Sequence, residues 1–392
     1  MMSTNKQVLF LNIGFSRCLS ILIFALSVVC LAPAEDGKPD ESAQAYQAGL
    51  QALTQAKHHD AFAAFQRAVK LDPTHAKAHY QLGVIYGKQS QWKPAIDALQ
   101  TAISLTPDFA EAHVRLGEAY LIGMASAKNA AKPLERALRL QPDHLRARRL
   151  LGDAYLRQNR IDDAIHHLEQ LVQDSEARYL LGLAHFQKED FAQAIPHFEA
   201  VIKRASRHAK AHFNLGNCYL RTGKVAEGRA ALRMFEKLTR EEEQLVSLQR
   251  LIHNDPQRLQ PRYELAELFM KRTEWELATA ELKAGLTIAP HDEKASELLG
   301  YIYLQTEAYP EALEVYGGLV EAHPESAIYR NSLGIIYMMQ KKPRQAIPQF
   351  ETATRLNTTN PQLYRNLANA YRQVGEQVKA EQAYRRYRSL TK

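Results

Sequence analysis

Histidine is the residue in this chain with the widest chemical use, because its imidazole binds metal ions and transfers protons near neutral pH. Fifteen histidines occur, and two adjacent pairs stand at 58–59 and 166–167. Adjacent side chains point to different sides of a helix, so neither pair places both imidazoles on one ion. His79, His113 and His212 share one position of a repeated segment, and none has a second ligand at helical spacing. We therefore expect packing or interface histidines in preference to metal ligands, and no bound metal.

Cysteine offers little further chemistry. The chain has three cysteines, of which Cys18 and Cys30 lie within the first thirty residues and Cys218 stands alone in the rest. A disulfide scaffold or a cysteine-rich zinc module is therefore excluded for the body of the chain. Cys218 precedes Tyr219 on an expected helix, where a buried small apolar side chain is the default interpretation and a reactive thiol is the alternative.

Sequence motifs of the common enzyme classes are missing from the chain. It contains no glycine-rich phosphate loop, no His-Glu-x-x-His zinc motif and no Gly-x-Ser-x-Gly nucleophile motif. With 46% hydrophobic and 24% charged residues, the composition is globular and excludes a collagen, a disordered chain and a polytopic membrane protein. We predict a protein that is not an enzyme and has no cofactor; a hydrolase or transferase is the disfavoured alternative.

Three clusters of basic side chains are the remaining chemical feature. The clusters are Arg146, Arg148 and Arg149; Lys203, Arg204 and Arg207; and Arg385, Arg386 and Arg388. Each can contact phosphate or an anionic lipid surface. The net charge is only +7, however, and acidic residues are interspersed, which favours solvated helix faces. We therefore expect no nucleic-acid partner.

The first 34 residues have the pattern of a targeting segment. Two basic residues and no acidic residue precede Glu35, an apolar run covers 19–32, and Ala32-Pro33-Ala34 ends the segment. A basic start, a short apolar run and a small-residue end are typical of a secretory signal peptide. We therefore predict a signal peptide over 1–34 and an exported protein, periplasmic or secreted. An uncleaved membrane anchor is the lesser alternative, because apolar residues at 8–13 could lengthen the run.

The elements that position all these side chains are set by an internal repeat. A Leu-Gly or Leu-Ala pair recurs at steps of 34, 35, 30, 34, 50, 34, 34 and 34 residues, and a large, usually aromatic residue follows the small one by three. The leucines are Leu82, Leu116, Leu151, Leu181, Leu215, Leu265, Leu299, Leu333 and Leu367. Further along each unit a small residue is followed by a large apolar one, as in Ala95 and Leu99. A weaker tenth copy of the repeat covers 42–75. Spacings of three and four predict two antiparallel helices in each unit.

This pattern resembles the tetratricopeptide repeat, and the resemblance covers residues 42–392. It implies an all-α fold, an α-α superhelix built as a solenoid of antiparallel helix pairs. We expect six units over 42–242, a helical insert at 243–258 that extends the sixth unit, and four units over 259–392. The stretch 225–254 is either one helix of about 43 Å or two helices broken at Thr239, where Glu242 completes a capping box.

A second row of side chains on each first helix is the predicted partner surface. We call it the first-helix row: the positions two before, two after and five after the leucine of the pair. In tetratricopeptide domains this row lines the inner groove, so it implies a trough for an extended or helical segment of another protein. Part of the row would instead pack against the adjacent unit. The candidate residues, with two neighbouring asparagines, are Tyr80, Val84, Tyr179, Leu183, Phe186, Phe213, Asn214, Asn217, Tyr263, Tyr301, Ile335, Met338, Asn366 and Asn369.

Two units carry the sequence Asn-Leu-(Gly/Ala)-Asn, beginning at Asn214 and Asn366. This is similar to the asparagine-bearing repeats of protein O-GlcNAc transferases, where such amides hold the backbone of a ligand. An amide can do this because it offers both a donor and an acceptor. The Lys/Asn clamp that tetratricopeptide co-chaperones use for terminal carboxylates is missing from the first units, where Tyr46 and Leu50 occupy its positions.

These features together predict a non-enzymatic scaffold or adaptor that binds a protein partner, a peptide segment or a complex, in its concave groove in the cell envelope. A scaffold for polysaccharide export or envelope assembly is the alternative, because aromatic side chains also stack on sugars. That alternative resembles the helical-repeat periplasmic proteins of exopolysaccharide export, and it keeps open an association with the envelope or with glycans.

Overall fold

The structure is a computed structural model that describes residues 40–391. The predicted signal peptide, residues 1–34, lies outside the described residues. Helices and short turns make up this part of the chain, and residues 40–391 contain no strand, as expected for the all-α class. The chain divides into two compact units, Met1–His144 and Leu145–Lys392. The predicted division into six repeats, an insert and four repeats remains a prediction, and each unit is described by itself.

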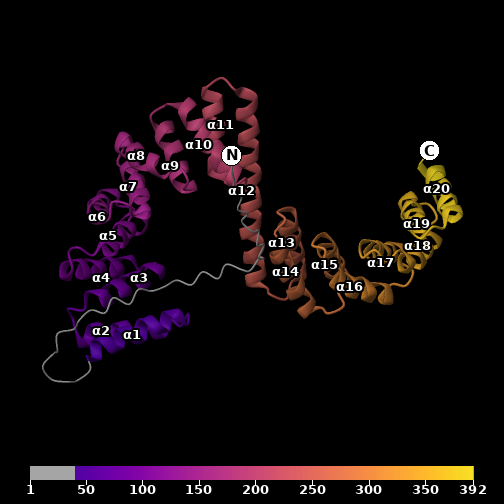
Figure 1. The fold of residues 1–392 in the computed structure, drawn as a ribbon, viewed down its shortest axis with the longest axis horizontal. Coiled ribbons are helices and arrows are strands. Elements are labelled where there is room, and N and C mark those ends of the chain that lie inside the picture. Colours follow the sequence, from indigo (N-terminus) through magenta and orange to yellow (C-terminus); the bar gives the residue numbers. More distant parts are fainter. Residues whose placement is uncertain (1–39, 392) are drawn as a thin grey trace, which may run out of the picture. The chain divides into compact units, whose positions relative to one another are not determined.

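The described residues 40–144 of the first unit form three helix pairs. Its helices are α1 (Glu41–Thr54), α2 (His58–Leu71), α3 (Ala76–Lys88), α4 (Trp92–Leu105), α5 (Ala110–Glu118) and α6 (Ala127–Leu140). Each odd-numbered helix packs on the even-numbered helix that follows it, and α2 and α4 also pack on the first helix of the next pair. This is the arrangement that the repeat predicts (Figure 1).

A π-helical turn in this unit explains why one repeat step is 35 residues and not 34. The turn η1 (Ala119–Gly123) follows α5 directly. A π-turn is an α-helix with one residue too many, so it absorbs the extra residue without moving α6 out of register. Gly123 is required here, because a Cβ atom at this position would lie 2.2 Å from the Trp92 ring.

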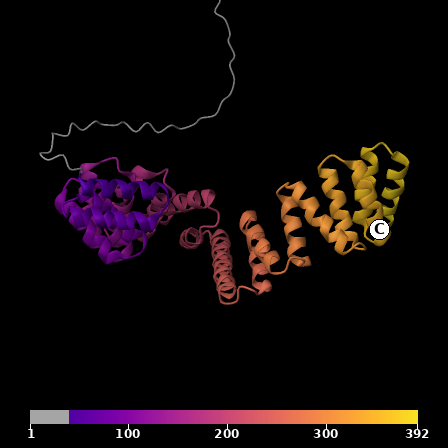
Figure 2. The ribbon, with the colours of Figure 1, turned by 90° about the horizontal axis from the view of Figure 1, so that it is seen from below.

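The unit from Leu145 onward contains seven pairs of helices. Its helices are α7 (Leu145–Arg157), α8 (Ile161–Leu168), α9 (Ser175–Gln187), α10 (Phe191–Arg204), α11 (Ala209–Arg221), α12 (Val225–Asn254), α13 (Leu259–Lys271), α14 (Trp275–Ile288), α15 (Glu293–Gln305), α16 (Tyr309–Ala322), α17 (Ala327–Met339), α18 (Pro343–Leu356), α19 (Pro361–Gln373) and α20 (Gln377–Thr391). Figure 2 shows the last pairs in orange to yellow, the two helices of each pair side by side. The short repeat step of 30 residues falls on α8, which ends in a single 3-10 turn, Glu169–Leu171.

The distance between the two helices of a pair is set where a small residue on the first helix faces a large residue on the second. A Cβ atom added to Gly182 would lie 2.7 Å from the Phe198 ring, and Phe198 is fully buried. Gly216 meets Leu232 in the same way, at 2.8 Å. Glycine therefore lets the two helix axes approach while the large side chain fills the space beside them.

Helix α12 is one unbroken helix of 30 residues, so the alternative of a break at Thr239 is wrong. Its first half lies along α11 and its second half along α13 (Figure 1). The first half packs on α11 through Leu232, and in the second half Leu248 joins the core around Leu265. Leu232 and Leu248 are 16 residues apart, which places them about 160° apart around an α-helix of 3.6 residues per turn. One helix therefore serves two repeats with nearly opposite faces.

The turn between the two helices of a pair uses a left-handed backbone conformation. The residues with positive φ include Ser90, Glu189 and Lys341, at 58°, 62° and 59°, and the equivalent position is glycine only at Gly223 and Gly375. Residues other than glycine are strained in the left-handed backbone conformation. The packing of the two helices of each pair therefore holds these residues in that conformation.

Candidate protein-binding surface

Contacts between successive first helices make the first-helix row a continuous surface over two or three repeats at a time. Helix α3 contacts α5, α7 contacts α9, α9 contacts α11, and α17 contacts α19. Side chains of the row that project from these helices are therefore neighbours in space. The row can hold a segment longer than one repeat only where this continuity exists.

Some members of the row tie neighbouring repeats together. The Tyr179 hydroxyl lies 3.1 Å from the Nδ2 atom of Asn214, which donates to it, and the Tyr179 ring packs on His208 at a centroid distance of 4.8 Å. Tyr80 repeats this arrangement on Phe109, also at 4.8 Å. Burial raises the pKa of the Tyr179 hydroxyl, which remains protonated at neutral pH. These side chains build the junction between repeats, the role that the sequence analysis left open for part of the row.

The amides of the Asn-Leu-(Gly/Ala)-Asn sequences are largely engaged within the protein. Asn366 donates through Nδ2 to the Oδ1 atom of Asn331 in the preceding repeat at 2.9 Å, and accepts from Gln362 at 3.1 Å. Asn217 donates to the carbonyl of Phe213 on its own helix at 2.9 Å. In the described residues 40–391, Asn369 has no side-chain hydrogen bond and is exposed. The Asn366 amide thus joins its repeat to the preceding one, whereas the Asn369 amide is open to solvent.

Other members of the row reach solvent with apolar surface. Phe213 is 43% exposed and Tyr301 45% exposed, and Leu220, five residues after the leucine of its pair, is 37% exposed. The half-buried candidates are Val84, Leu183, Phe186, Ile335 and Met338, and Tyr263 is buried. Exposed aromatic side chains that are held by a rigid helix are the usual anchors for a protein partner.

The three equivalent histidines close the turn before their helix. The Nε2 atoms of His79, His113 and His212 lie 2.9, 2.8 and 2.9 Å from the carbonyl oxygens of residues 73, 107 and 206, six positions earlier in each case. Nε2 donates in this contact, because a carbonyl only accepts. Residues 40–391 contain no group of three His, Cys, Asp or Glu side chains able to hold a metal ion. These histidines therefore have a structural role that sequence spacing by itself could not show.

Cys218 lies inside the unit and has no disulfide partner in the described part of the chain. Burial raises the pKa of its thiol to about 11. Because the thiolate is the reactive form of cysteine, a buried thiol that stays protonated is inert. This position fits the default interpretation of a small apolar side chain.

The Cys218 thiol is expected to resist modification in the folded protein. In a variant with Cys18→Ser and Cys30→Ser, Ellman's reagent at pH 8 should label less than about a tenth of the thiol until denaturant unfolds the chain. The raised pKa also means that the native state binds one more proton than the unfolded state at alkaline pH. The free energy of unfolding should therefore fall as pH rises from about 8.5 towards 11. Rapid labelling without denaturant would contradict this assignment.

Tyrosines on several first helices donate to the second helix of the preceding repeat. The Tyr219 hydroxyl donates to Glu199, and the Tyr371 hydroxyl donates to Glu351. Burial, with the adjacent Glu199 carboxylate, raises the pKa of Tyr219 to about 12. The acceptor stands 20 residues before the tyrosine in both repeats, so this spacing is a signal that can identify such pairs in the sequence.

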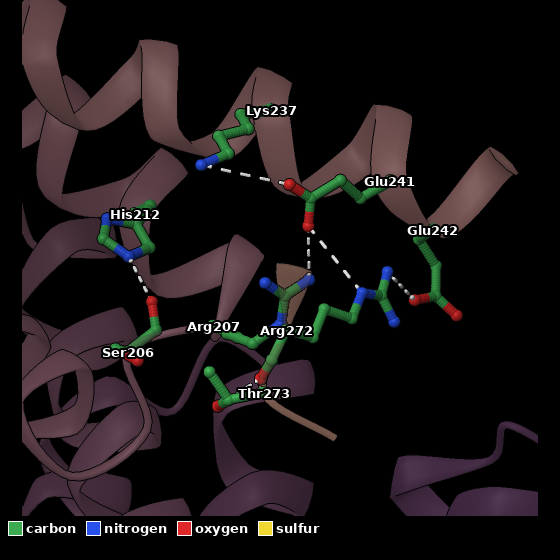
Figure 3. A network of polar contacts seen from close by, with 8 residues as sticks. All are labelled: Ser206, Arg207, His212, Lys237, Glu241, Glu242, Arg272 and Thr273. Atoms are coloured by element: carbon green, nitrogen blue, oxygen red, sulfur yellow. Dashed lines mark hydrogen bonds and ion pairs between the residues drawn. The ribbon is translucent and has the colours of Figure 1, made fainter. Parts of the chain in front are cut away.

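A charged network around α12 is the largest polar feature that sequence reasoning missed. The Glu241 carboxylate lies 2.6 Å from the Nη2 atom of Arg207, 3.7 Å from the Nε atom of Arg272 and 4.0 Å from the Nζ atom of Lys237 (Figure 3). Arg272 also lies 3.6 Å from Glu242, and its side chain is only 6% exposed. Glu241 thus joins the turn before α11 to the end of α13. No local pattern marks these residues, because they come from three separate segments.

A membrane-spanning helix is not found among residues 40–391, since none of these helices is both long and apolar enough.

Comparisons with known proteins agree with this architecture. The sequence matches the family described as tetratricopeptide repeat over residues 126–178, 179–241, 263–327, 297–343 and 331–391, and TPR repeat over 57–90 and 88–122. It is 28% identical over 179 residues to the type IV pilus assembly protein PilF of Pseudomonas aeruginosa, covering 44% of this chain and 64% of that relative. Whole-protein properties of that relative therefore do not transfer directly.

Two solved structures are also similar. YrrB, a TPR protein with an unusual peptide-binding site, is 21% identical, with a TM-score of 0.40; 45% of this chain and 92% of that chain are covered. PilW, a widely conserved type IV pilus biogenesis factor, is 17% identical, with a TM-score of 0.43, and 50% and 91% are covered.

Proposed function

Because this chain belongs to the tetratricopeptide repeat family, we propose that it is a non-enzymatic scaffold that holds a segment of a protein partner along its first-helix row, in the cell envelope. Proteins of this family are built for interaction, because stacked helix pairs present a long surface and no enclosed reaction chamber. The N-terminal signal pattern and the similarity to a pilus assembly protein support the envelope location.

The observation that carries the proposal is the exposure of apolar side chains on the row. Phe213 and Leu220 lie two turns apart on α11 and expose 43% and 37% of their surface, and Tyr301 on α15 exposes 45%. Leaving such side chains in water costs free energy that a bound segment would recover. Tyr179, Asn214 and Asn366 hold the repeats in register in this proposal, and the exposed members make the contact.

The test replaces apolar row residues and compares them with apolar residues elsewhere that are at least as exposed. The double variant Phe213→Ser with Leu220→Ser should lose at least about tenfold in capture of its partner from an envelope extract, since buried aromatic anchors contribute about 2 kcal/mol or more. The matched control is Leu277→Ser with Val378→Ser; these residues are 51% and 73% exposed and lie on second helices. Partners are identified by mass spectrometry, and far-UV circular dichroism verifies helicity. Equal capture by both variants would refute the row as the binding surface.

Envelope assembly is the second candidate function, because the matched relative is an assembly protein of the type IV pilus. A glycan ligand would fit the same exposed aromatics, since the faces of Phe213 and Tyr301 can stack on sugar rings. Glycan-array binding that is lost in the Phe213→Ser, Leu220→Ser variant would favour this candidate over a protein segment.

A further inference from the structure

Charge is distributed unevenly over the last three repeats. Residues 289–326 contain eight acidic residues and one lysine, whereas residues 327–391 contain eleven basic residues and three glutamates. The mild excess of +7 for the whole chain hides this local contrast. A strong positive field at the last two repeats attracts negatively charged groups and raises their local concentration.

The three glutamates of the last two repeats are already engaged. Glu351 accepts from the Tyr371 hydroxyl, Glu376 pairs with Lys379 at 2.7 Å, and Glu381 pairs with Arg385 at 3.3 Å. All three belong to α18, α20 or the turn before α20, and none lies on α17 or α19. The first helices of these repeats therefore carry no carboxylate to neutralise their own arginines.

Arg365 and Arg372 are the arginines of α19 that lie on the first-helix row. They are seven residues apart, which places them about 20° apart around the helix, and exposed Asn369 lies between them. Within residues 40–391, neither guanidinium has a hydrogen bond or an ion pair. Most other arginines of these repeats do have a partner: Arg386, for example, donates to the carbonyl of Thr358 at 3.4 Å.

An apolar surface adjoins this basic one. Helix α17 contacts α19, and the Asn331–Asn366 bond of 2.9 Å links them at the row. Ile335 and Met338 of α17 are half-buried members of the row. A ligand lying across the two helices would therefore meet aliphatic side chains on α17 and two unpaired guanidinium groups with an amide on α19.

We propose that the row of α17 and α19 binds a protein segment that carries acidic residues beside apolar ones, with the acidic residues over Arg365 and Arg372. This inference rests on the proposed function and specifies the chemistry of the partner. The guanidinium group matches a carboxylate through two parallel hydrogen bonds, and the Asn369 amide can both donate to and accept from a peptide backbone. A protein segment is favoured over an anionic lipid surface because the basic groups alternate with an amide and adjoin aliphatic side chains.

The experiment uses the full chain and two fluorescein-labelled peptides of sixteen residues with blocked termini. One begins with four glutamates and the other with four lysines, and both continue with the same leucine-, phenylalanine- and serine-containing sequence. Fluorescence anisotropy should show the glutamate peptide binding about tenfold more tightly than the lysine peptide, because each of two carboxylate–guanidinium contacts contributes about threefold to fivefold. Higher salt should weaken the binding.

Charge-reversal variants locate the site. Arg365→Glu with Arg372→Glu should weaken the glutamate peptide at least about tenfold, whereas the matched control Arg385→Glu with Arg388→Glu, on α20, should change it less than about twofold. Equal binding of the two peptides, or equal losses in the two variants, would overturn the proposal. Binding of phosphatidylglycerol vesicles that requires Arg365 and Arg372, without binding of either peptide, would also overturn it in favour of a membrane surface.

The outcomes for this site and for the proposed function can be told apart. If the Phe213→Ser, Leu220→Ser variant loses its envelope partner while the Arg365→Glu, Arg372→Glu variant behaves as wild type in every assay, the scaffold function stands and the acidic-segment inference fails. If the glutamate peptide binds at α19 but neither row variant affects capture of the envelope partner, the first-helix row is not where that partner binds.

Discussion

Replacing Phe198 with alanine is expected to lower the free energy of unfolding of the unit from Leu145 onward by about 4 kcal/mol, as observed for fully buried phenylalanines. Phe198 is fully buried against Gly182, in a core with Leu215 and Cys218. Removing the ring leaves a cavity where two repeats meet. The surrounding helices cannot move together to fill it, because each of them is held by contacts with other helices. Urea unfolding followed by circular dichroism at 222 nm measures the loss.

A compensating pair tests whether the loss arises from the fit between the two helices. Gly182→Ala places a Cβ atom 2.7 Å from the Phe198 ring and should cost about 2 kcal/mol through overpacking. Adding Phe198→Leu should recover about half of that cost, because the chain already contains Ala266 with Leu282 at the equivalent positions, and both are fully buried. Additive losses in the double variant would show that these residues do not share one packing constraint.

Replacing Glu241 with alanine is expected to destabilise the same unit by about 3 kcal/mol, since the buried Arg272 would keep only its 3.6 Å contact with the exposed Glu242. Arg272 is the buried partner: its side chain is 6% exposed, and its Nε and Nη2 atoms have no hydrogen bond. Arg207 would lose its 2.6 Å contact at the same time. The midpoint of urea unfolding should fall accordingly, and the ends of α11 and α13 should exchange amide hydrogens faster.

Removing the charge of Arg272 as well distinguishes an unpaired charge from lost packing. The double variant Glu241→Ala with Arg272→Met should be more stable than Glu241→Ala by about 2 kcal/mol, because methionine needs no counter-ion. The control is Glu236→Ala on the same helix, which breaks an exposed 3.4 Å pair with Arg240 and should cost less than about 0.5 kcal/mol. A double variant no more stable than Glu241→Ala would show that the network acts through geometry and not through charge.

The sequence by itself determined the fold class and the repeat. Both depend on side chains three, four or about seventeen residues apart on one helix or one helix pair, so the pattern is local and can be read directly. Whether 225–254 forms one helix or two was decided by the structure. The pairing of a small residue with a large one, as at Gly182 and Phe198, follows from the same spacing. Family and all-α class were therefore predicted correctly from residue spacing.

Tertiary structure alone decided how each row residue is used. Tyr179 and Asn214 were equivalent to Phe213 as candidates, yet the first two bond to each other across a junction while Phe213 remains 43% exposed. That difference depends on residues about one repeat away and on how closely two repeats approach. The histidine–carbonyl contacts and the π-turn at Ala119–Gly123 are local in the sequence, but they depend on the path of the backbone through a turn, which the spacing of apolar residues does not specify.

The network around Glu241 shows the limit of sequence reasoning most clearly. Arg207, Glu241 and Arg272 lie on three segments, and their charges look like ordinary solvated residues along the chain. Only the continuous helix α12, which packs one face on α11 and the nearly opposite face on α13, brings them within 3.7 Å. Periodicity specifies which helix faces are buried, whereas the partners of a polar side chain depend on segments that the stacking of repeats brings together.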